Sequence, residues 1–232
     1  YSYGITGRAY TSEHVVRDVS GHSTLIEDFH ADGTLALKQT MSADGVRTLD
    51  QYDSGGRLAQ ETITQKDGSY LQSNYASNGA LTSETARHAD GTRVVDTFGL
   101  AGQSYSARHD TFDAAGHRVS TVFDQNDGTH VMTATMSGVT LTASATSDVL
   151  NSAGGDTFVF KQAGGHDVIH NFRAGEAAGH DVIQIDSSVA ADLAQLSVHV
   201  VGHDTVIDLG HDASITLTGV TAPLTAHDLL IV

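Results

Sequence analysis

The sequence predicts an all-β protein: an antiparallel repeat meander of hairpins, followed by a β-roll or β-sandwich-like C-terminal domain. Three observations predict this fold class. Turn dipeptides such as Asp-Gly recur every 23 residues in the first part of the chain. From about residue 147 the segments between turns become aliphatic, and a glycine turn with an aspartate opens most of them. A helical pattern is found only at 189–196, and the chain has a single proline.

The first part, residues 1–146, repeats a pattern of two turns and two strands. Asp-Gly between extended segments is the strongest short hairpin signal, because both residues tolerate the positive φ of tight turns. The turns lie at 43–46, 66–69 and 89–92, and, alternating with these, at 52–56, 75–79 and 98–102. The intervening strands are poor in large apolar residues. We therefore expect a long meander with a thin apolar seam, partly open to water.

A duplicated segment marks the two ends of this first part. Residues 7–34 align without a gap to residues 102–129. The shared Gly-x-x-Tyr-x₃-His pattern gives two pairs, Tyr10 with His14 and Tyr105 with His109. Because residues i and i+4 of a strand share a face, each pair would place a ring beside an imidazole. Sugars favour that arrangement, so we predict carbohydrate binding here, with packing in the apolar seam as the alternative.

Further aromatic residues recur at the 23-residue spacing. Tyr52, Tyr75 and Phe98 stand at equivalent positions, and packing in the seam is the favoured interpretation for them. The repeats resemble the tyrosine-aspartate repeats of bacterial shell proteins, whose pattern also combines an aromatic residue with a nearby Asp and Gly.

The second part, residues 147–232, has its own pattern of strands and acidic turns. Its aliphatic segments predict strands at 157–160, 167–172, 181–186, 196–201, 204–209, 213–220 and 228–232. Asp156, Asp167 and Asp181 open successive strands, so their carboxylates would converge on one edge if the strands stack. Glycine turns expose carbonyls, and Ca²⁺ takes six to eight hard oxygen ligands. Calcium is the favoured interpretation of the set, and ordinary turn chemistry is the alternative for each aspartate.

This second part resembles the C-terminal region of secreted calcium-binding RTX proteins, which are exported by type I secretion. Two stretches carry the resemblance. The first begins with GGDTFVF and ends with DVIQID, and the second begins with GHDTVIDL and ends with DLLIV. It implies calcium between neighbouring turns and an uncleaved export signal at the C-terminus, recognised by the type I secretion machinery. It also implies a secreted, extracellular protein. The metal-ligand candidates are Gly154, Asp156, Gly164, Asp167, Asn171, Gly179 and Asp181.

Composition narrows the classes of partner. With 12 Lys and Arg against 28 Asp and Glu, the net charge of −16 argues against a nucleic-acid partner. The chain has no cysteine, which excludes disulfides and thiolate metal sites. No stretch approaches 18 apolar residues, so no membrane span is expected. The histidines of the Gly-His-Asp turns lack the spacing of a zinc site and are interpreted as surface turn residues. The start at Tyr1, without a leader pattern, suggests a piece of a longer protein.

These observations favour a non-catalytic, calcium-stabilised accessory region that binds extracellular polysaccharide. The sequence contains no nucleophile elbow, phosphate loop or zinc-hydrolase helix. Two alternatives remain open: a structural or adhesive matrix module, and a lyase or glycoside hydrolase that acts on acidic polysaccharide. If calcium holds the acidic turns together, a chelator is expected to lower the melting temperature.

Overall fold

The computed structural model describes residues 2–4 and 10–232, which divide into two compact units. Unit 1 comprises Tyr1–Gly99 with Asp113–Gly116, and unit 2 comprises Leu100–Phe112 with His117–Val232. Both consist of strands joined by short turns, and the described residues contain a single 3₁₀ helix. The predicted all-β class is therefore confirmed. No helix among residues 2–4 and 10–232 is long and apolar enough to cross a membrane.

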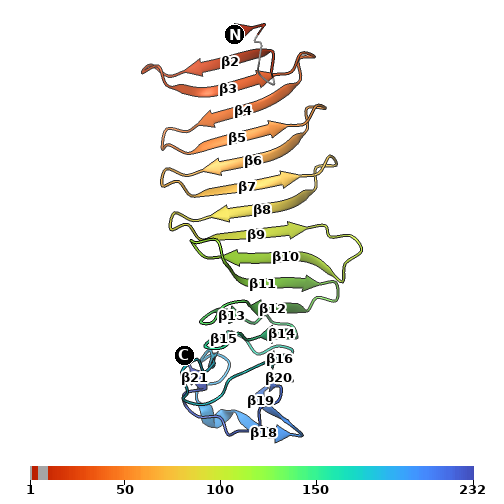
Figure 1. Ribbon diagram of the computed structural model, residues 1–232, viewed down its shortest axis with the longest axis vertical. Helices are drawn as coiled ribbons and strands as arrows, with labels where there is room; N and C mark the ends of the chain where they lie inside the picture. Colours follow the sequence, from red (N-terminus) through yellow and green to blue (C-terminus); the bar gives the residue numbers. More distant parts are fainter. Residues whose placement is uncertain (1, 5–9) are drawn as a thin grey trace. The chain divides into compact units, whose positions relative to one another are not determined.

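Unit 1 is an antiparallel meander in which β2 to β9 each pair with the next strand (Figure 1). Its strands are β1 (Ser2–Tyr3), β2 (Ser12–Arg17), β3 (Ser23–Phe29), β4 (Leu35–Met41), β5 (Arg47–Tyr52), β6 (Leu58–Thr64), β7 (Tyr70–Tyr75), β8 (Leu81–Arg87) and β9 (Arg93–Phe98). The short β1 pairs with β2. These hairpins follow the predicted 23-residue repeat.

The Asp-Gly turns close the hairpins as the sequence predicts. Gly68 adopts a φ of 86°, and its N–H donates to the Gln65 carbonyl at 3.0 Å. Asp67 Oδ1 accepts the N–H and the hydroxyl of Ser69, at 2.9 and 2.7 Å. Glycine is needed where φ is positive, and the aspartate satisfies a donor that the turn leaves open.

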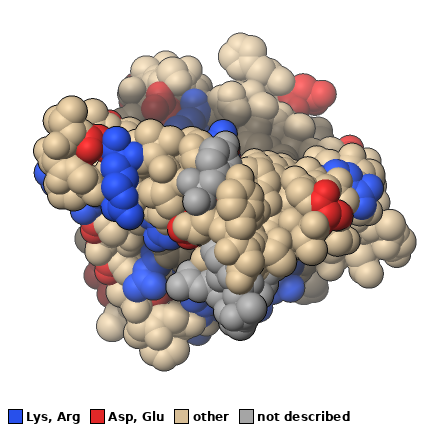
Figure 2. Space-filling view, turned by 90° about the horizontal axis from the view of Figure 1, so that it is seen from above, with Lys and Arg blue, Asp and Glu red and all other residues tan. Residues whose placement is uncertain are grey.

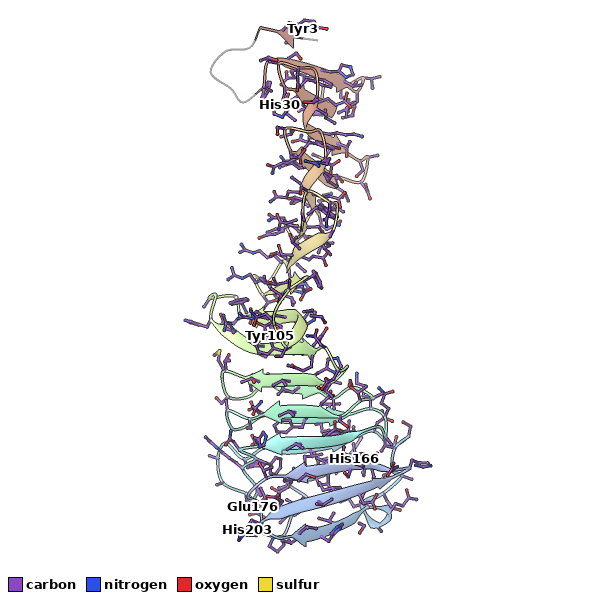
Figure 3. All side chains as sticks on the ribbon, turned by 90° about the vertical axis from the view of Figure 1, so that its right-hand side faces the viewer. Tyr3, His30, Tyr105, His166, Glu176 and His203 are labelled. Carbon is purple, nitrogen blue, oxygen red and sulfur yellow. The ribbon has the colours of Figure 1, made fainter. Side chains whose placement is uncertain are left out.

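Unit 1 has a single layer, and side chains project from both of its faces (Figure 3). Among the described residues, the buried hydrophobic core contains no side chain from β2 to β9, which fits the expected thin seam. Polar rows cross the strands instead. Gln51 donates to Gln60 at 2.8 Å, and Gln60 donates to Asn74 at 2.8 Å. Asn74 in turn donates to Ser83 at 3.0 Å. In Figure 2, basic and acidic side chains lie interspersed on the described part of the visible face.

Unit 2 contains two sheets. Sheet A has the order β10, β11, β12, β14, β16, β20, β19, β18, and sheet B has the order β13, β15, β17, β21. The sheet A strands are β10 (Tyr105–Phe112), β11 (Arg118–Gln125), β12 (His130–Ala134), β14 (Asp148–Asn151), β16 (His166–His170), β18 (Ser197–Val201), β19 (Asp204–Gly210) and β20 (Ala213–Leu217). The sheet B strands are β13 (Thr140–Thr142), β15 (Thr157–Phe160), β17 (Val182–Ile185) and β21 (Leu229–Ile231).

From β12 to β17 the chain alternates between the two sheets, and all pairing between successive coils is parallel. Leu150 and Ile169 of sheet A belong to the same buried cluster as Phe158 and Ile183 of sheet B. Alternating residues thus fill one core between the sheets, as in the predicted β-roll. The predicted boundary at residue 146 lies between β12 and β14, where antiparallel pairing gives way to parallel pairing.

The segment 189–196 forms far less helix than its pattern suggests. Only the 3₁₀ turn η1 (Leu193–Gln195) is helical, and Asp192 caps it by accepting the Ala194 N–H. None of its residues is buried, so tertiary packing adds nothing to a short and weak helical propensity.

Candidate functional site

Five of the aspartates that stand at the starts of strands in unit 2 are buried. The positions are Asp148, Asp156, Asp167, Asp181 and Asp228. Burying an ionised carboxylate is costly unless hydrogen bonds compensate it. Their partners therefore explain why the sequence repeats an aspartate after its glycine turns.

Asp156 ties its own turn to the preceding coil of sheet B. Its Oδ2 accepts the N–H of Ala153 at 2.7 Å and that of Gly154 at 3.1 Å. Its Oδ1 accepts the Val139 N–H at 2.8 Å, and the Ser152 hydroxyl donates to Oδ2 at 3.0 Å. Three backbone N–H groups thus depend on one fully buried carboxylate.

Asp181 repeats this role one coil later. Its Oδ1 accepts the Asp156 N–H at 2.8 Å, and its Oδ2 accepts the Arg173 N–H at 2.8 Å. The Ser152 hydroxyl lies 2.8 Å from the same Oδ2. The aspartates of sheet B therefore form a ladder in which each carboxylate binds backbone of the coil before it.

Sheet A contains a second ladder. Asp148 accepts the His130 N–H at 3.2 Å and the Ser144 N–H at 2.6 Å, and its Oδ1 lies 2.9 Å from His130 Nδ1. The Asp148 N–H donates to Asp167 Oδ1 at 2.8 Å. Burial raises the pKa of Asp167 to about 7. The hydrogen bond from Asp148 opposes that rise, and repulsion from the Asp148 carboxylate adds to it.

The predicted metal ligands do not assemble into one site. Asp156 and Asp181 lie together in sheet B, whereas Asp167 belongs to the ladder of sheet A. Backbone oxygens of the set are also engaged: Gly179 O accepts the Gly155 N–H at 2.8 Å, and Gly154 O accepts the Gly138 N–H at 3.3 Å.

In the structure these oxygens therefore take part in backbone hydrogen bonds. Within residues 2–4 and 10–232, no group of three or more His, Asp or Glu side chains is arranged to hold a metal ion. Calcium binding itself stays a prediction.

The two remaining members of the set have conformational roles. A Cβ on Gly164 would lie 2.4 Å from the Ala145 carbonyl oxygen, so glycine permits the close approach of neighbouring turns. Asn171 follows β16 with a φ of 61°, a left-handed conformation that asparagine tolerates.

The Tyr105 and His109 pair does not share a face, so that premise of the sequence analysis is wrong. Tyr105 packs edge-on against Phe123 with ring centroids 4.6 Å apart, while His109 Nε2 lies 3.1 Å from Asp124 Oδ2. Phe123 and Asp124 are consecutive on β11 and point to opposite faces. A β-bulge between Tyr105 and Ala107 shifts the register and reverses the expected side.

The Tyr10 and His14 pair is also divided. Tyr10 precedes β2, and its hydroxyl lies 3.5 Å from Glu13 Oε2. His14 Nδ1 lies 2.9 Å from Glu27 Oε2 on β3. Glu13 and His14 are consecutive strand residues with opposite directions, so these contacts lie on opposite faces of the strand. The first residues of the duplicated segment, 7–9, lie outside the described residues.

Sequence reasoning gave less weight to the aromatic row of unit 1, which the structure places beside a hollow. Asp50, Ser73 and Asp96 belong to one row of paired residues that crosses the strands from β5 to β9. The three aromatic residues Tyr52, Tyr75 and Phe98 each stand two positions further along β5, β7 and β9. They therefore lie on the same face of the sheet. Alternate strands place successive rings about 9.5 Å apart. All three are half-buried. Burial, followed by repulsion from the Asp50 carboxylate, raises the pKa of Tyr52.

The hollow beside Tyr75 has a volume of about 440 Å³ and a mixed lining. Its walls are formed by Arg57, Leu58, Tyr75, Ser77, Asn78 and Gly79. Arg57 is held by Asp53 at 3.0 Å, and Asn78 Oδ1 accepts the Ala80 N–H at 3.0 Å. The hollow combines a ring and a leucine with guanidinium, hydroxyl and amide groups, the mixture that small polar ligands and sugars require.

Comparisons with known proteins identify no family. No family model matches the chain, and no curated protein matches it. Among solved structures, the crystal structure of TarM matches with a TM-score of 0.28 and 8% identity. That match covers 72% of this chain and 33% of the TarM chain, so this chain spans about a third of that protein. A likeness at this level identifies neither a fold family nor a function.

Proposed function

We propose that the chain is a non-catalytic accessory region of a secreted protein and that unit 1 binds an extracellular polysaccharide. The observation that carries this proposal is the aromatic row of Tyr52, Tyr75 and Phe98, with the hollow beside its central ring. A half-buried ring is fixed in place while part of its face stays available, which lowers the entropy cost of stacking a sugar on it.

The repetition of the row suits a polymer better than a small molecule. Successive rings stand two strands apart, about 9.5 Å, a spacing close to the length of a disaccharide unit. A chain of sugars laid across the strands would meet one ring per repeat. Several weak contacts on one polymer then add up through effective concentration.

The test is a glycan array, followed by titration of the best ligand into three proteins. Tyr75→Ala removes the central ring and is expected to weaken binding at least about tenfold, as truncation of an aromatic hot spot does. Tyr70→Ala is the matched control, because Tyr70 lies on the same strand but points to the opposite face. It is expected to bind like the wild type.

Two results would reject the proposal. One is an array on which no polysaccharide is retained, and the other is equal weakening by both substitutions. A reducing-end assay on the bound polymer addresses the enzymatic alternative, because an increase in ends would require catalysis. Secretion by a type I pathway, which the RTX resemblance implies, is tested by deleting the C-terminal segment in an exporting host.

A further inference from the structure

The sheet of unit 1 separates its charges by face. All four carboxylates of β5 to β9 belong to the row of paired residues that runs beside the aromatic rings, and we call this set the acidic row: Asp50, Glu61, Glu84 and Asp96. A second row of paired residues contains the three arginines of the same strands: Arg47, Arg87 and Arg93. Because Arg47 and Asp50 are three positions apart on β5, the two rows lie on opposite faces of the sheet. Unit 1 therefore has an acidic face, which carries the aromatic rings, and a basic face.

The acidic row has no cation beside it within its own strands. Asp50 lies opposite Glu61, and Glu84 lies opposite Asp96. Like charges in directly opposed positions destabilise a sheet. From β5 to β9 the strands place no Lys, Arg or His on this face, and the row meets its first cation at Lys38 of β4. Water and dissolved cations, or a cationic ligand, must offset the repulsion within the row.

The acidic row lies next to the aromatic rings. Tyr52 stands two positions beyond Asp50, about 7 Å further along β5. Burial raises the pKa of Tyr52, and repulsion from the Asp50 carboxylate adds to the rise. Glu27 and Glu61 contribute in the same direction. Asp50 Oδ1 is shielded from water and has no hydrogen-bond partner within the described part of the chain. A ligand that stacks on the rings would thus lie close to these carboxylates.

The hollow beside Tyr75 does not reverse this charge. Arg57 is the one charged residue among those that line it. Its guanidinium is already paired, because Arg57 Nε donates to Asp53 Oδ2 at 3.0 Å. An acidic glycan on the rings would therefore meet the repulsion of the acidic row without an unpaired cation to compensate it.

We propose that the aromatic face of unit 1 selects its glycan by charge: it takes a polymer of amino sugars with free amines and rejects acidic polysaccharides. This inference rests on the proposed function, because the rings and the hollow form the binding site and the acidic row sets only its charge preference. The row has one or two carboxylates for every two strands, the span of about one disaccharide. Each ammonium group beside the row offsets part of the repulsion between opposed carboxylates, whereas a carboxylate or sulfate on the glycan adds to it.

Three probes with one linkage test the charge preference. They are β-1,4-linked oligomers of glucosamine, glucose and glucuronic acid, titrated calorimetrically in a mildly acidic buffer in which the amines are charged. The wild type is expected to bind the glucosamine oligomer about tenfold more tightly than the glucose oligomer, because several exposed ion pairs of modest strength add together. The glucuronic acid oligomer is expected to bind most weakly. High salt is expected to reduce both differences, since it screens exposed charges.

The double variant Glu61→Gln, Glu84→Gln removes two charges from the row and is expected to lose most of the preference for glucosamine over glucose. The control is Asp67→Asn, Asp127→Asn, which changes the net charge of −16 equally but at exposed turns. Asparagine keeps such a turn, as Asn78 shows by accepting the Ala80 N–H at 3.0 Å. The control is expected to retain the preference, which separates an effect of the row from an effect of the net charge.

The possible failures of this inference and of the proposed function are distinct. Equal binding of the three probes, tighter binding of the glucuronic acid oligomer, or a preference that survives in the Glu61 and Glu84 double variant would overturn the charge selection alone. A glycan array that retains only acidic polysaccharides would do the same. An array that retains nothing would reject the proposed function and the charge selection with it.

Discussion

Replacing Asp156 by alanine tests whether the buried aspartates hold the roll together. The change removes the acceptor of three backbone N–H groups, those of Val139, Ala153 and Gly154. Asp156 is fully buried, so water does not replace the lost carboxylate. An unsatisfied buried donor costs about 1–3 kcal/mol, so three of them predict a loss of at least about 3 kcal/mol.

The assay is urea unfolding followed by circular dichroism, with hydrogen exchange at single amides. The wild type and Asp156→Ala are compared in the same buffer, and the free energy of unfolding is expected to fall by the amount above. The amide of Val139 is expected to lose its protection, because it would no longer have an acceptor. Asp127→Ala is the matched control: Asp127 lies in a turn and also accepts a backbone N–H, but it is exposed and bonds only the nearby Thr129.

A loss for Asp156→Ala no larger than that of the control would refute the reasoning. It would mean that the buried N–H groups find other acceptors, or that water enters the turn. Retained protection at Val139 would point to the same conclusion without relying on the size of the free energy.

Three further predictions concern unit 2. Burial raises the pKa of Asp167 in the folded protein to about 7, above the 3.8 of an exposed aspartate, so its contribution to stability is full below about pH 3.8 and is lost as pH rises through 7. Asp167→Asn, which cannot ionise, is expected to unfold at higher urea than the wild type at pH 8 and at equal urea near pH 3.5; no difference at pH 8 would contradict this. Gly164→Ala places a Cβ against the Ala145 carbonyl and is expected to cost about 1–3 kcal/mol in urea unfolding, whereas Gly55→Ala meets only the flexible side chains of Asp53 and Arg57 and is expected to cost less. If Ca²⁺ binds these turns, EDTA is expected to lower the melting temperature by more than the roughly 2–4 °C that 1 kcal/mol produces, and added Ca²⁺ to restore it; a smaller change would contradict the calcium prediction.

The sequence predicts the hairpins of unit 1 well because each is specified locally. A turn such as Asp67-Gly68 determines its own conformation through one positive φ and one short hydrogen bond. The neighbouring strands then pair by default with the next segment along the chain. Nothing in this arrangement depends on residues far away in the sequence, and the 23-residue period repeats the same local solution.

The expectation of a shared face fails where a distant partner decides which way a side chain points. The i, i+4 rule places Tyr105 and His109 on one face, but the bulge opposite Asp124 shifts the register between them. Bulges depend on the paired strand and leave no reliable signal in the bulged one. The aromatic row was visible from its spacing, but the hollow beside Tyr75 arises from two turns, at 53–57 and 76–80, that meet only in the folded sheet.

The two kinds of aspartate in this chain show why a turn motif alone does not define a metal site. Asp67 and Asp156 both follow or accompany glycine in a turn, and both accept backbone N–H groups. Asp67 lies in a single layer, where water surrounds its carboxylate, so it contributes only to its own turn. Asp156 lies under a second sheet, where the same acceptor must also bind the preceding coil. The two aspartates therefore differ in what covers them. The coils that bury Asp156 come from other parts of the sequence, so their position is known only from the fold. Unfolding and metal titration, measured on the same protein, distinguish this backbone role of the carboxylate from a role in binding a metal.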